Sequence, residues 1–200
     1  MGALKVITLA TANTEGLIVA AGLGDDRIEV SGTTGPALTV DGGESSTGDR
    51  LVMISIENVA DFNYAPGQAN DSGALTMDTS VTQFVGIEDI TLDAGLGAGA
   101  NAADNVTING TSAANQIRFA AHATNADEAT VWIDARPAIA LRQFTNASNV
   151  TVNGLLGDDV ITVAPNKADT NFDNLTVNAG GPADADRVMV EGTSGDDTFR

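Results

Sequence analysis

The 200-residue chain has no cysteine, only eight aromatic residues (six Phe, one Trp, one Tyr) and only nine basic residues. The absence of cysteine excludes disulfide bonds and cysteine-ligated zinc. Nine basic residues against 27 acidic ones leave a net charge of −18. This charge argues against nucleic acid and anionic membrane surfaces as partners, since both attract clustered Lys and Arg. No apolar run is long enough to span a membrane, and Met1-Gly2 begins no signal peptide.

The residues that are abundant are small and apolar. Hydrophobic residues make up 42% of the chain, mostly Ala, Val, Ile and Leu, and there are 22 glycines. Such a chain is too apolar for a disordered acidic tail. It is also long enough to bury a core in one domain, so we expect a core of small and β-branched side chains.

Two short phrases recur along the chain. One reads apolar-Thr-apolar-Asn/Asp-Gly/Ala and occurs at residues 36–43, 88–95, 148–155 and 173–180. The other reads Asp-polar-apolar-x-apolar-polar-Gly-Thr and occurs at residues 26–35, 104–113 and 186–195. In both phrases apolar residues alternate with polar ones, which indicates short β-strands separated by Gly and Asn turns.

Strands this short cannot bury a face alone, but stacked coils of such strands can. The sequence therefore predicts an all-β fold, a right-handed parallel β-solenoid. We expect a single domain over residues 1–200, with roughly seven coils of about two dozen residues and two main strands each. A third short strand per coil is an open alternative. Residues 62–75 and 120–143 depart from the repeat, the second because it lacks the glycine turn, so they are predicted to be irregular loops or insertions, with a loop or short helix near 135–142.

A Gly-Asp-Asp motif marks three of the turns, at residues 21–29, 154–162 and 192–200. Each copy resembles the nonapeptide G-G-x-G-x-D-x-U-x of the RTX, or haemolysin-type, calcium-binding repeats, with one substitution. Residues 110–118 look like a decayed copy in which Asn115 replaces the aspartate. The resemblance covers the whole chain loosely and these turns closely. It implies a solenoid, like those of large bacterial surface proteins, with calcium between the turns of neighbouring coils.

The motif suits calcium for a chemical reason. Calcium takes six to eight oxygen ligands, and glycines allow positive φ angles that aim carbonyl groups inward. Stacking would place Asp25 and Asp26 beside Asp49, and would place Asp158 and Asp159 beside Asp184 and Asp186, where a divalent ion would offset their repulsion. The competing interpretation is that Gly-Asp-Asp is turn chemistry alone. The predicted metal-binding residues are Gly24, Asp25, Asp26, Asp49, Gly157, Asp158, Asp159, Asp184, Asp186, Gly195, Asp196 and Asp197.

Other polar residues give weaker signals. His122 with Asp127 and Glu128 could form a metal or acid–base site, but a lone His is more often a surface residue. Outward threonines could form a flat binding rank or merely reflect β-propensity on a solvent face. The sequons at Asn105, Asn109, Asn146, Asn149 and Asn174 could carry glycans, although the repeat itself spells Asn-x-Thr. No nucleophile–base arrangement or phosphate loop is present, so we do not expect an enzyme.

These observations favour a non-enzymatic extracellular structural or adhesive solenoid, secreted or on a bacterial cell surface, with Ca²⁺ bound at its acidic turns. Both ends of the chain run directly into strand or turn sequence, so we expect a segment of a longer repeat protein. One alternative is a carbohydrate-binding module of a secreted polysaccharide-modifying enzyme, which predicts one groove displaying Tyr64, Trp132 and Arg136. The other is a self-polymerising filament subunit that pairs strands end to end. The expected partners are neighbouring coils or chains and surface glycan.

Overall fold

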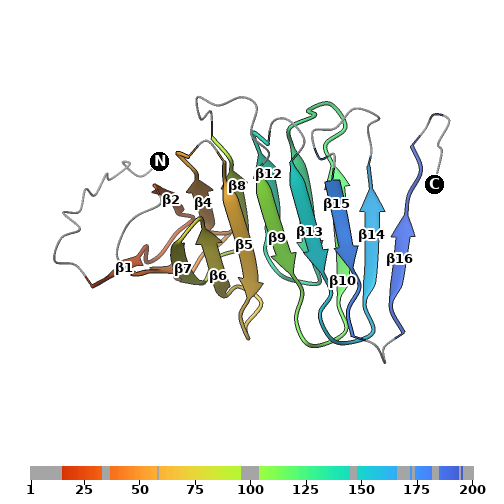
Figure 1. Ribbon diagram of the computed structural model, residues 1–200. Helices are drawn as coiled ribbons and strands as arrows, with labels where there is room; N and C mark the ends of the chain where they lie inside the picture. The colour runs from red at the N-terminus through yellow and green to blue at the C-terminus, as the bar shows by residue number, and fades with distance from the viewer. Residues whose placement is uncertain are drawn as a thin grey trace.

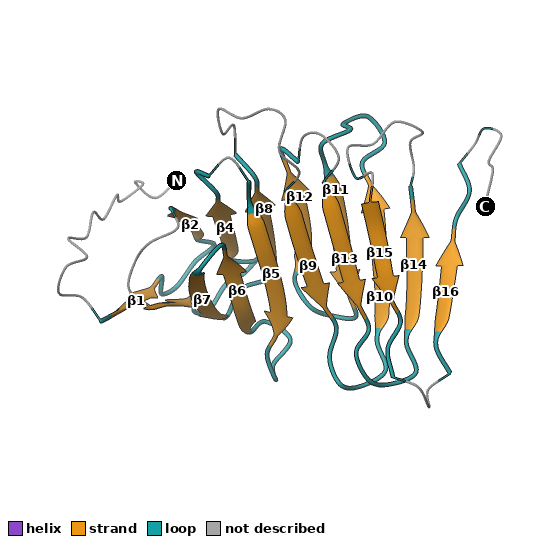
Figure 2. Ribbon diagram, viewed as in Figure 1, coloured by secondary structure: helices purple, strands orange, loops and turns teal. Residues whose placement is uncertain are grey.

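The residues that the structure describes form two eight-stranded β-sheets that lie face to face (Figures 1 and 2). The computed structural model describes residues 15–32, 37–57, 59–95, 104–144, 148–165, 172, 174–181, 185–193 and 195. These residues contain sixteen strands and no helix, and hence no helix with the length and hydropathy to cross a bilayer. The prediction of an all-β fold is confirmed.

The strands alternate between the sheets as the chain advances, except that β5, β6 and β7 share the first sheet and β10, β11 and β12 share the second. In spatial order the first sheet contains β1 (Gly16–Ala20), β3 (Ala37–Asp41), β7 (Ser80–Val85), β6 (Gly73–Met77), β5 (Asp61–Pro66), β9 (Asn105–Asn109), β13 (Asn149–Asn153) and β15 (Asn174–Asn178). In the same direction the second sheet contains β2 (Arg27–Ser31), β4 (Arg50–Ile54), β8 (Asp89–Asp93), β12 (Ala138–Arg142), β11 (Ala129–Ile133), β10 (Gln116–Ala121), β14 (Val160–Ala164) and β16 (Arg187–Val190).

Most neighbouring strands pair in parallel, in a register that keeps apolar residues in columns. Ten of the described pairings are parallel. For example, Val19 lies beside Val40, and Val150 lies beside Leu175. A one-residue slip would turn each apolar column outward, so the alternation itself holds the register.

The other four pairings are antiparallel and belong to two three-strand meanders, β5–β6–β7 and β10–β11–β12. The sheets are therefore mixed, where the sequence predicted parallel pairing throughout. The meanders occupy the ranges 62–75 and 120–143, which were expected to be irregular, and β12 covers the stretch expected to hold a loop or short helix. That expectation was wrong because these segments keep the period-two alternation, with buried and exposed residues alternating along β5.

Aspartate replaces glycine at the tight turns of the meanders. Asp78, between β6 and β7, has a φ of 54°, and Asp134, between β11 and β12, has a φ of 48°. Aspartate tolerates the left-handed region better than most residues, because its short side chain can bond locally. The absence of a glycine turn in residues 120–143 therefore did not prevent a tight turn between β11 and β12.

The aromatic side chains concentrate in the core beside the meanders. The ring centroids of Phe62 and Phe144 are 6.1 Å apart, those of Phe144 and Phe172 are 5.9 Å apart, and Phe119 meets Phe172 edge-on at 5.8 Å. Between the parallel strands at both ends of the stack, Val, Ile and Leu fill the space between the sheets. Phe144 is fully buried at the centre of this ring cluster.

We expect Phe144→Ala to destabilise the fold by about 3–5 kcal/mol, because it opens a cavity between the rings of Phe62 and Phe172. Chemical denaturation followed by far-UV circular dichroism measures this loss. Trp132→Ala is the matched control: Trp132 lies on the outer face of the second sheet, 40% exposed, and its loss should cost less than about 1 kcal/mol. Equal losses for the two variants would contradict this description of the core.

Candidate functional site

The turns that lead from the first sheet to the second all lie along one edge, and those that follow β9, β13 and β15 are seen at the bottom of Figure 1. Their described residues are 21–26, 42–49, 86–88, 110–115, 154–159, 179–181 and 185–186. We call this the acidic edge. It contains the described residues that the sequence predicted as metal ligands, apart from Gly195.

One polar residue stands directly before each of six strands of the second sheet, and together these residues form a ladder. The ladder residues are Asp26, Asp49, Glu88, Asn115, Asp159 and Asp186. The N–H of Asp26 donates to Asp49 Oδ1 at 2.7 Å, and the N–H of Asp49 donates to Glu88 Oε2 at 2.6 Å. Further along, the N–H of Asn115 donates to Asp159 Oδ1 at 2.7 Å, and that of Asp159 donates to Asp186 Oδ1 at 2.9 Å.

Every step of the ladder runs in the same direction along the stack. The donors and acceptors are 23 and 27 residues apart where one coil separates them, close to the predicted two dozen. They are 39 and 44 residues apart where a meander intervenes. The backbone N–H of each donor, at the start of a strand, would otherwise lack an acceptor. It is satisfied by the side chain of the ladder residue that stands before the neighbouring strand of the second sheet.

The first aspartate of the Gly-Asp-Asp motif has a different partner. Asp25 accepts hydrogen bonds from the N–H groups of Thr47 at 2.8 Å and Ser46 at 2.9 Å. These bonds, that of Thr47 above all, hold the pKa of Asp25 well below its ordinary value. In the second copy, Asp158 accepts from the N–H of Ala185 at 2.9 Å. The first aspartate therefore fastens the next turn, and the second belongs to the ladder.

Glycines make room for these carboxylates. Gly24 and Gly157 have φ angles of 118° and 115°, which L-residues rarely adopt, as the motif predicted. Gly42 serves another purpose: a Cβ there would clash with the carbonyl oxygen of Gly86 and lie 2.9 Å from Asp49 Oδ2. At Gly154 a Cβ would clash with Asp159 Oδ2. The Asn/Asp-Gly turns thus contain glycine because the ladder carboxylates pack against its Cα.

The surroundings of Asp49 disfavour a charged carboxylate. It is fully buried, and burial is the main cause that raises the pKa of its carboxyl group, aided by the charges of Glu88, Asp26 and Asp25. Its Oδ2 and the Oδ2 of Asp26 are buried without a hydrogen-bond partner in the described part of the chain. A cluster of like charges with two unsatisfied oxygens therefore lies between the first coils.

The predicted metal ligands are only partly brought together. Asp25, Asp26 and Asp49 are neighbours, and so are Asp158, Asp159 and Asp186, as the stacking argument predicted. Asp184, Asp196 and Asp197 lie outside the described residues, and Gly195 is exposed beyond β16. Within the described ranges, no three His, Cys, Asp or Glu side chains are grouped so that they could hold a metal ion. Side chains alone would not complete an ion's shell here.

His122 does not form a site with Asp127 and Glu128. Its Nδ1 accepts hydrogen bonds from the N–H groups of Thr124 at 3.3 Å and Asn125 at 3.2 Å, within its own turn. The ring therefore caps the β10–β11 connection, which agrees with the surface role that a lone histidine usually has.

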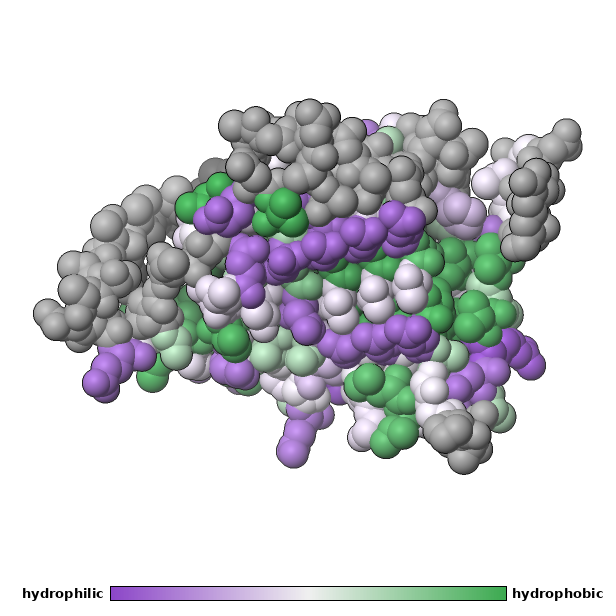
Figure 3. All heavy atoms as spheres, viewed as in Figure 1, coloured by the Kyte–Doolittle hydropathy of each residue, from purple (hydrophilic) through white to green (hydrophobic). Residues whose placement is uncertain are grey.

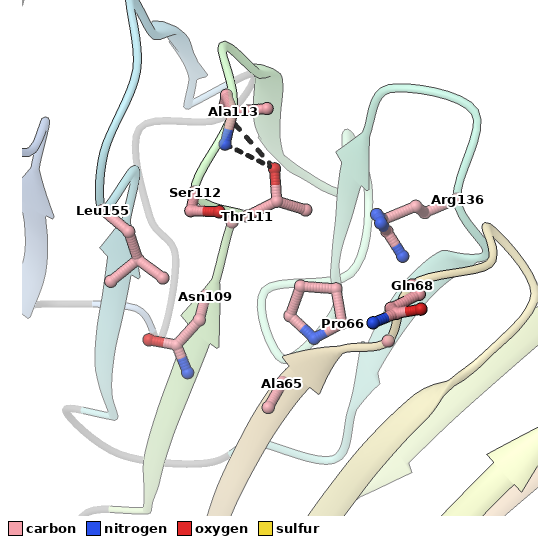
Figure 4. A pocket seen from close by; sticks show the side chains of 11 residues that line it. Ala65, Pro66, Gln68, Asn109, Thr111, Ser112, Ala113, Arg136 and Leu155 are labelled. Atoms are coloured by element: carbon pink, nitrogen blue, oxygen red, sulfur yellow. Dashed lines mark hydrogen bonds between the residues drawn. The ribbon is translucent and has the colours of Figure 1, made fainter.

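The ladder is interrupted between Glu88 and Asn115, where the meanders replace coils. Asp134 substitutes for a ladder carboxylate there: Asn115 Nδ2 donates to its Oδ2 and the N–H of Gln116 to its Oδ1, both at 2.7 Å. Beside the interruption lies an open hollow of about 740 Å³ (Figure 4). It is lined by residues 65–68, residues 109–113, Arg136 and Leu155.

The outer face of the first sheet carries two asparagine ladders with threonines between them. Strands β9, β13 and β15 all read Asn-x-Thr-x-Asn and lie in register. Asn149 Nδ2 donates to Asn105 Oδ1 at 2.9 Å, and Asn174 Nδ2 donates to Asn149 Oδ1 at 3.0 Å. Asn153 and Asn178 continue a second ladder from Asn109, at 2.8 Å per step. Figure 3 shows them as two hydrophilic rows flanking paler threonines.

This arrangement changes two expectations about the face. The side-chain nitrogens of the sequon residues Asn105, Asn109, Asn149 and Asn174 all donate hydrogen bonds, that of Asn105 to Asp61 Oδ1 and that of Asn109 to the carbonyl oxygen of Tyr64. A glycan there would cost those bonds; Asn146 lies outside the described residues. The predicted threonine rank is divided between the sheets: Thr39, Thr107, Thr151 and Thr176 are in the first sheet, and Thr91 and Thr162 are in the second.

Sequence reasoning missed Glu88 as part of the acidic edge, and it missed Asp134 as the carboxylate that binds Asn115 where the ladder is interrupted. The available signal for Glu88 was its place directly before an alternating strand, which Asp26 and Asp49 share. The sequence alignment of the repeats was also wrong at one place. It grouped residues 104–113, which contain β9, with the residues around β2 and β16, but β9 belongs to the first sheet and β2 and β16 belong to the second. Tyr64 is fully buried and Trp132 lies on the outer face of the second sheet, so the groove that the carbohydrate-module alternative predicted is absent among the described residues.

No protein-family model, curated protein or solved structure matches this chain.

The raised pKa of Asp49 predicts a specific pH dependence. A carboxyl group whose pKa is higher in the folded than in the unfolded state binds protons preferentially in the folded state. Its ionisation therefore lowers the stability of the fold as the pH rises from the unfolded-state pKa to the folded-state pKa. We therefore expect Asp49→Asn to raise the thermal midpoint at pH 7 and to weaken the dependence of the midpoint on pH above the pKa of an ordinary carboxyl group. Asn115 already places an amide at the same ladder position.

Thermal unfolding of both proteins across this pH range tests the prediction. Asp25→Asn is the matched control, because the pKa of Asp25 is lowered and its loss should destabilise the protein at pH 7. A lower midpoint for Asp49→Asn at pH 7 would show that the buried charge is stabilised by something other than the described residues.

Proposed function

We propose that the chain is a non-enzymatic structural segment of a secreted or cell-surface protein, a right-handed parallel β-solenoid interrupted by two meanders. The observation that carries this proposal is the acidic ladder, whose hydrogen bonds join successive turns along one axis on both sides of the interruption between Glu88 and Asn115. The asparagine ladders add two more rows of bonds in the same direction. Polar groups that link successive coils suit a part that bears load along its length.

A pulling experiment tests the structural role. With the full chain held at its two termini, we expect a series of force peaks, each releasing about one coil, because neighbouring coils are held by separate rows of bonds. Asp159→Ala removes one ladder acceptor and should lower the force of one peak. Extension at low force without discrete peaks would overturn the load-bearing role.

In this proposal calcium binds at the turn that contains Asp25, Asp26 and Asp49. Two observations support it: the buried Oδ2 atoms of Asp26 and Asp49 have no hydrogen-bond partner in the described residues, and like charges crowd Asp49. These oxygens would hold the ion, with backbone carbonyls and water completing the shell of oxygens that calcium prefers. An ion bound only by the folded chain would couple folding to the calcium-rich exterior.

The calcium proposal predicts that added Ca²⁺ raises the thermal midpoint of chelator-treated protein, by about 2–4 °C for each kcal/mol of binding free energy. Circular dichroism during a calcium titration measures both the midpoint and any gain of β-structure, with Mg²⁺ as the ion control. Asp49→Asn should abolish most of the calcium shift while keeping the fold.

A midpoint that is unchanged by calcium would overturn the calcium site and leave the structural role intact. An equal shift in the wild-type protein and in Asp49→Asn would show that calcium binds elsewhere on the acidic chain.

A further inference from the structure

The hollow at the interruption of the ladder differs in chemistry from the rest of the acidic edge. It forms where the β5–β6 turn, the β9–β10 turn and the β11–β12 turn meet, because the meanders prevent these turns from stacking as regular coils do. None of the residues that line it is acidic. The one charged residue that lines the hollow is Arg136. The lining is therefore positively charged, although the chain as a whole has a net charge of −18.

The guanidinium of Arg136 is held in place from one side only. Its Nη1 donates to the carbonyl oxygen of Ala69 at 3.1 Å. It also lies close enough to the buried hydroxyl of Tyr64 for its charge to oppose the rise in pKa that burial causes. Arg136 forms no ion pair with any described residue. Its remaining N–H groups are therefore positioned but have no carboxylate of the described chain to bind.

The other groups that line the hollow are suited to contact a sugar ring. Figure 4 shows Arg136 and Gln68 on one side of the hollow and Ser112 and Leu155 on the other, with Pro66 between them. Within the described residues, no side-chain hydrogen bond occupies Gln68 or Ser112. Pro66 and the 44% exposed Leu155 offer apolar surface on which the C–H face of a sugar can lie.

We propose that this hollow binds a short saccharide that carries a carboxylate, a uronate-containing oligosaccharide. The guanidinium takes the carboxylate, the amide of Gln68 and the hydroxyl of Ser112 bind ring hydroxyls, and Pro66 and Leu155 contact the rings. The planar guanidinium favours a carboxylate because it can form two parallel bonds to it. The volume lies within the range of small-molecule sites. The site involves none of the proposed calcium ligands, so its failure and the failure of the calcium site are distinguishable.

Ligand-observed NMR and calorimetry on the full chain, in 0.15 M salt to screen the net charge, test the proposal. The probes are digalacturonate, its neutral dimethyl ester and acetate. We expect saturable binding of digalacturonate, at least about 10-fold weaker binding of the ester, and no measurable binding of acetate, because bonds to a charged group dominate but need the ring contacts. Arg136→Gln should weaken digalacturonate binding by about 10-fold or more.

Two further variants keep the test decisive. Arg142→Gln removes an exposed arginine at the end of β12, outside the hollow, and should leave binding unchanged. Ser112→Trp fills the hollow from an exposed turn and leaves residue 136 as arginine, and it should abolish binding even if Arg136→Gln proves unstable. The proposal fails if digalacturonate does not bind, if acetate or the ester binds equally well, or if the folded Ser112→Trp variant retains full affinity.

Discussion

The hydrogen bond from a backbone N–H to the carboxylate of the next coil is the interaction on which the acidic edge depends. A chain that turns from one sheet into the other leaves an N–H at the start of the new strand, and a buried N–H needs an acceptor. The side chain one coil further along supplies it, at 2.7 Å for Asp26 and Asp49. This constraint accounts for an oxygen-bearing residue before the strand, for glycine at the preceding turn, and for a repeat of near-constant length.

The same interaction explains much of the acidity of the chain without a ligand. Asp25, Asp158 and the ladder residues each bond to a neighbouring turn, so negative charge is part of the scaffold. Most of these charges are balanced by N–H donors, which favour the ionised form. Asp26 and Asp49 differ, because the Oδ2 atom of each is buried with no donor in the described residues. The sites where a cation would bring most stability are therefore those where the ladder leaves an oxygen unsatisfied, not every Gly-Asp-Asp turn.

The two meanders give the stack its irregular and chemically distinct region. They leave the sheets continuous, since β7 pairs in parallel with β3 and β10 pairs in parallel with β14, but they remove regular turns from the acidic edge. Two effects follow at the same place. The core contains the aromatic rings of Phe62, Phe119 and Phe144 in place of small aliphatic columns, and the edge carries Arg136 beside a hollow. A recognition site is more easily built at such a discontinuity than along a uniform row of carboxylates.

The sequence by itself determined the short strands, the faces they bury and the turn chemistry between them, because alternation and glycine placement are local signals. It also predicted that Asp26 lies beside Asp49 and Asp159 beside Asp186, because equal coil lengths bring equal positions together. It could not show which strands are neighbours: both phrases alternate in the same way, so β9 was aligned with strands of the other sheet. Only the tertiary structure decided that residues 62–75 and 120–143 extend the sheets as meanders, that Tyr64 points into the core, and that Arg136 stands at a break in the ladder. These depend on pairing between distant segments, where the register of a whole sheet and not the local pattern selects the partner.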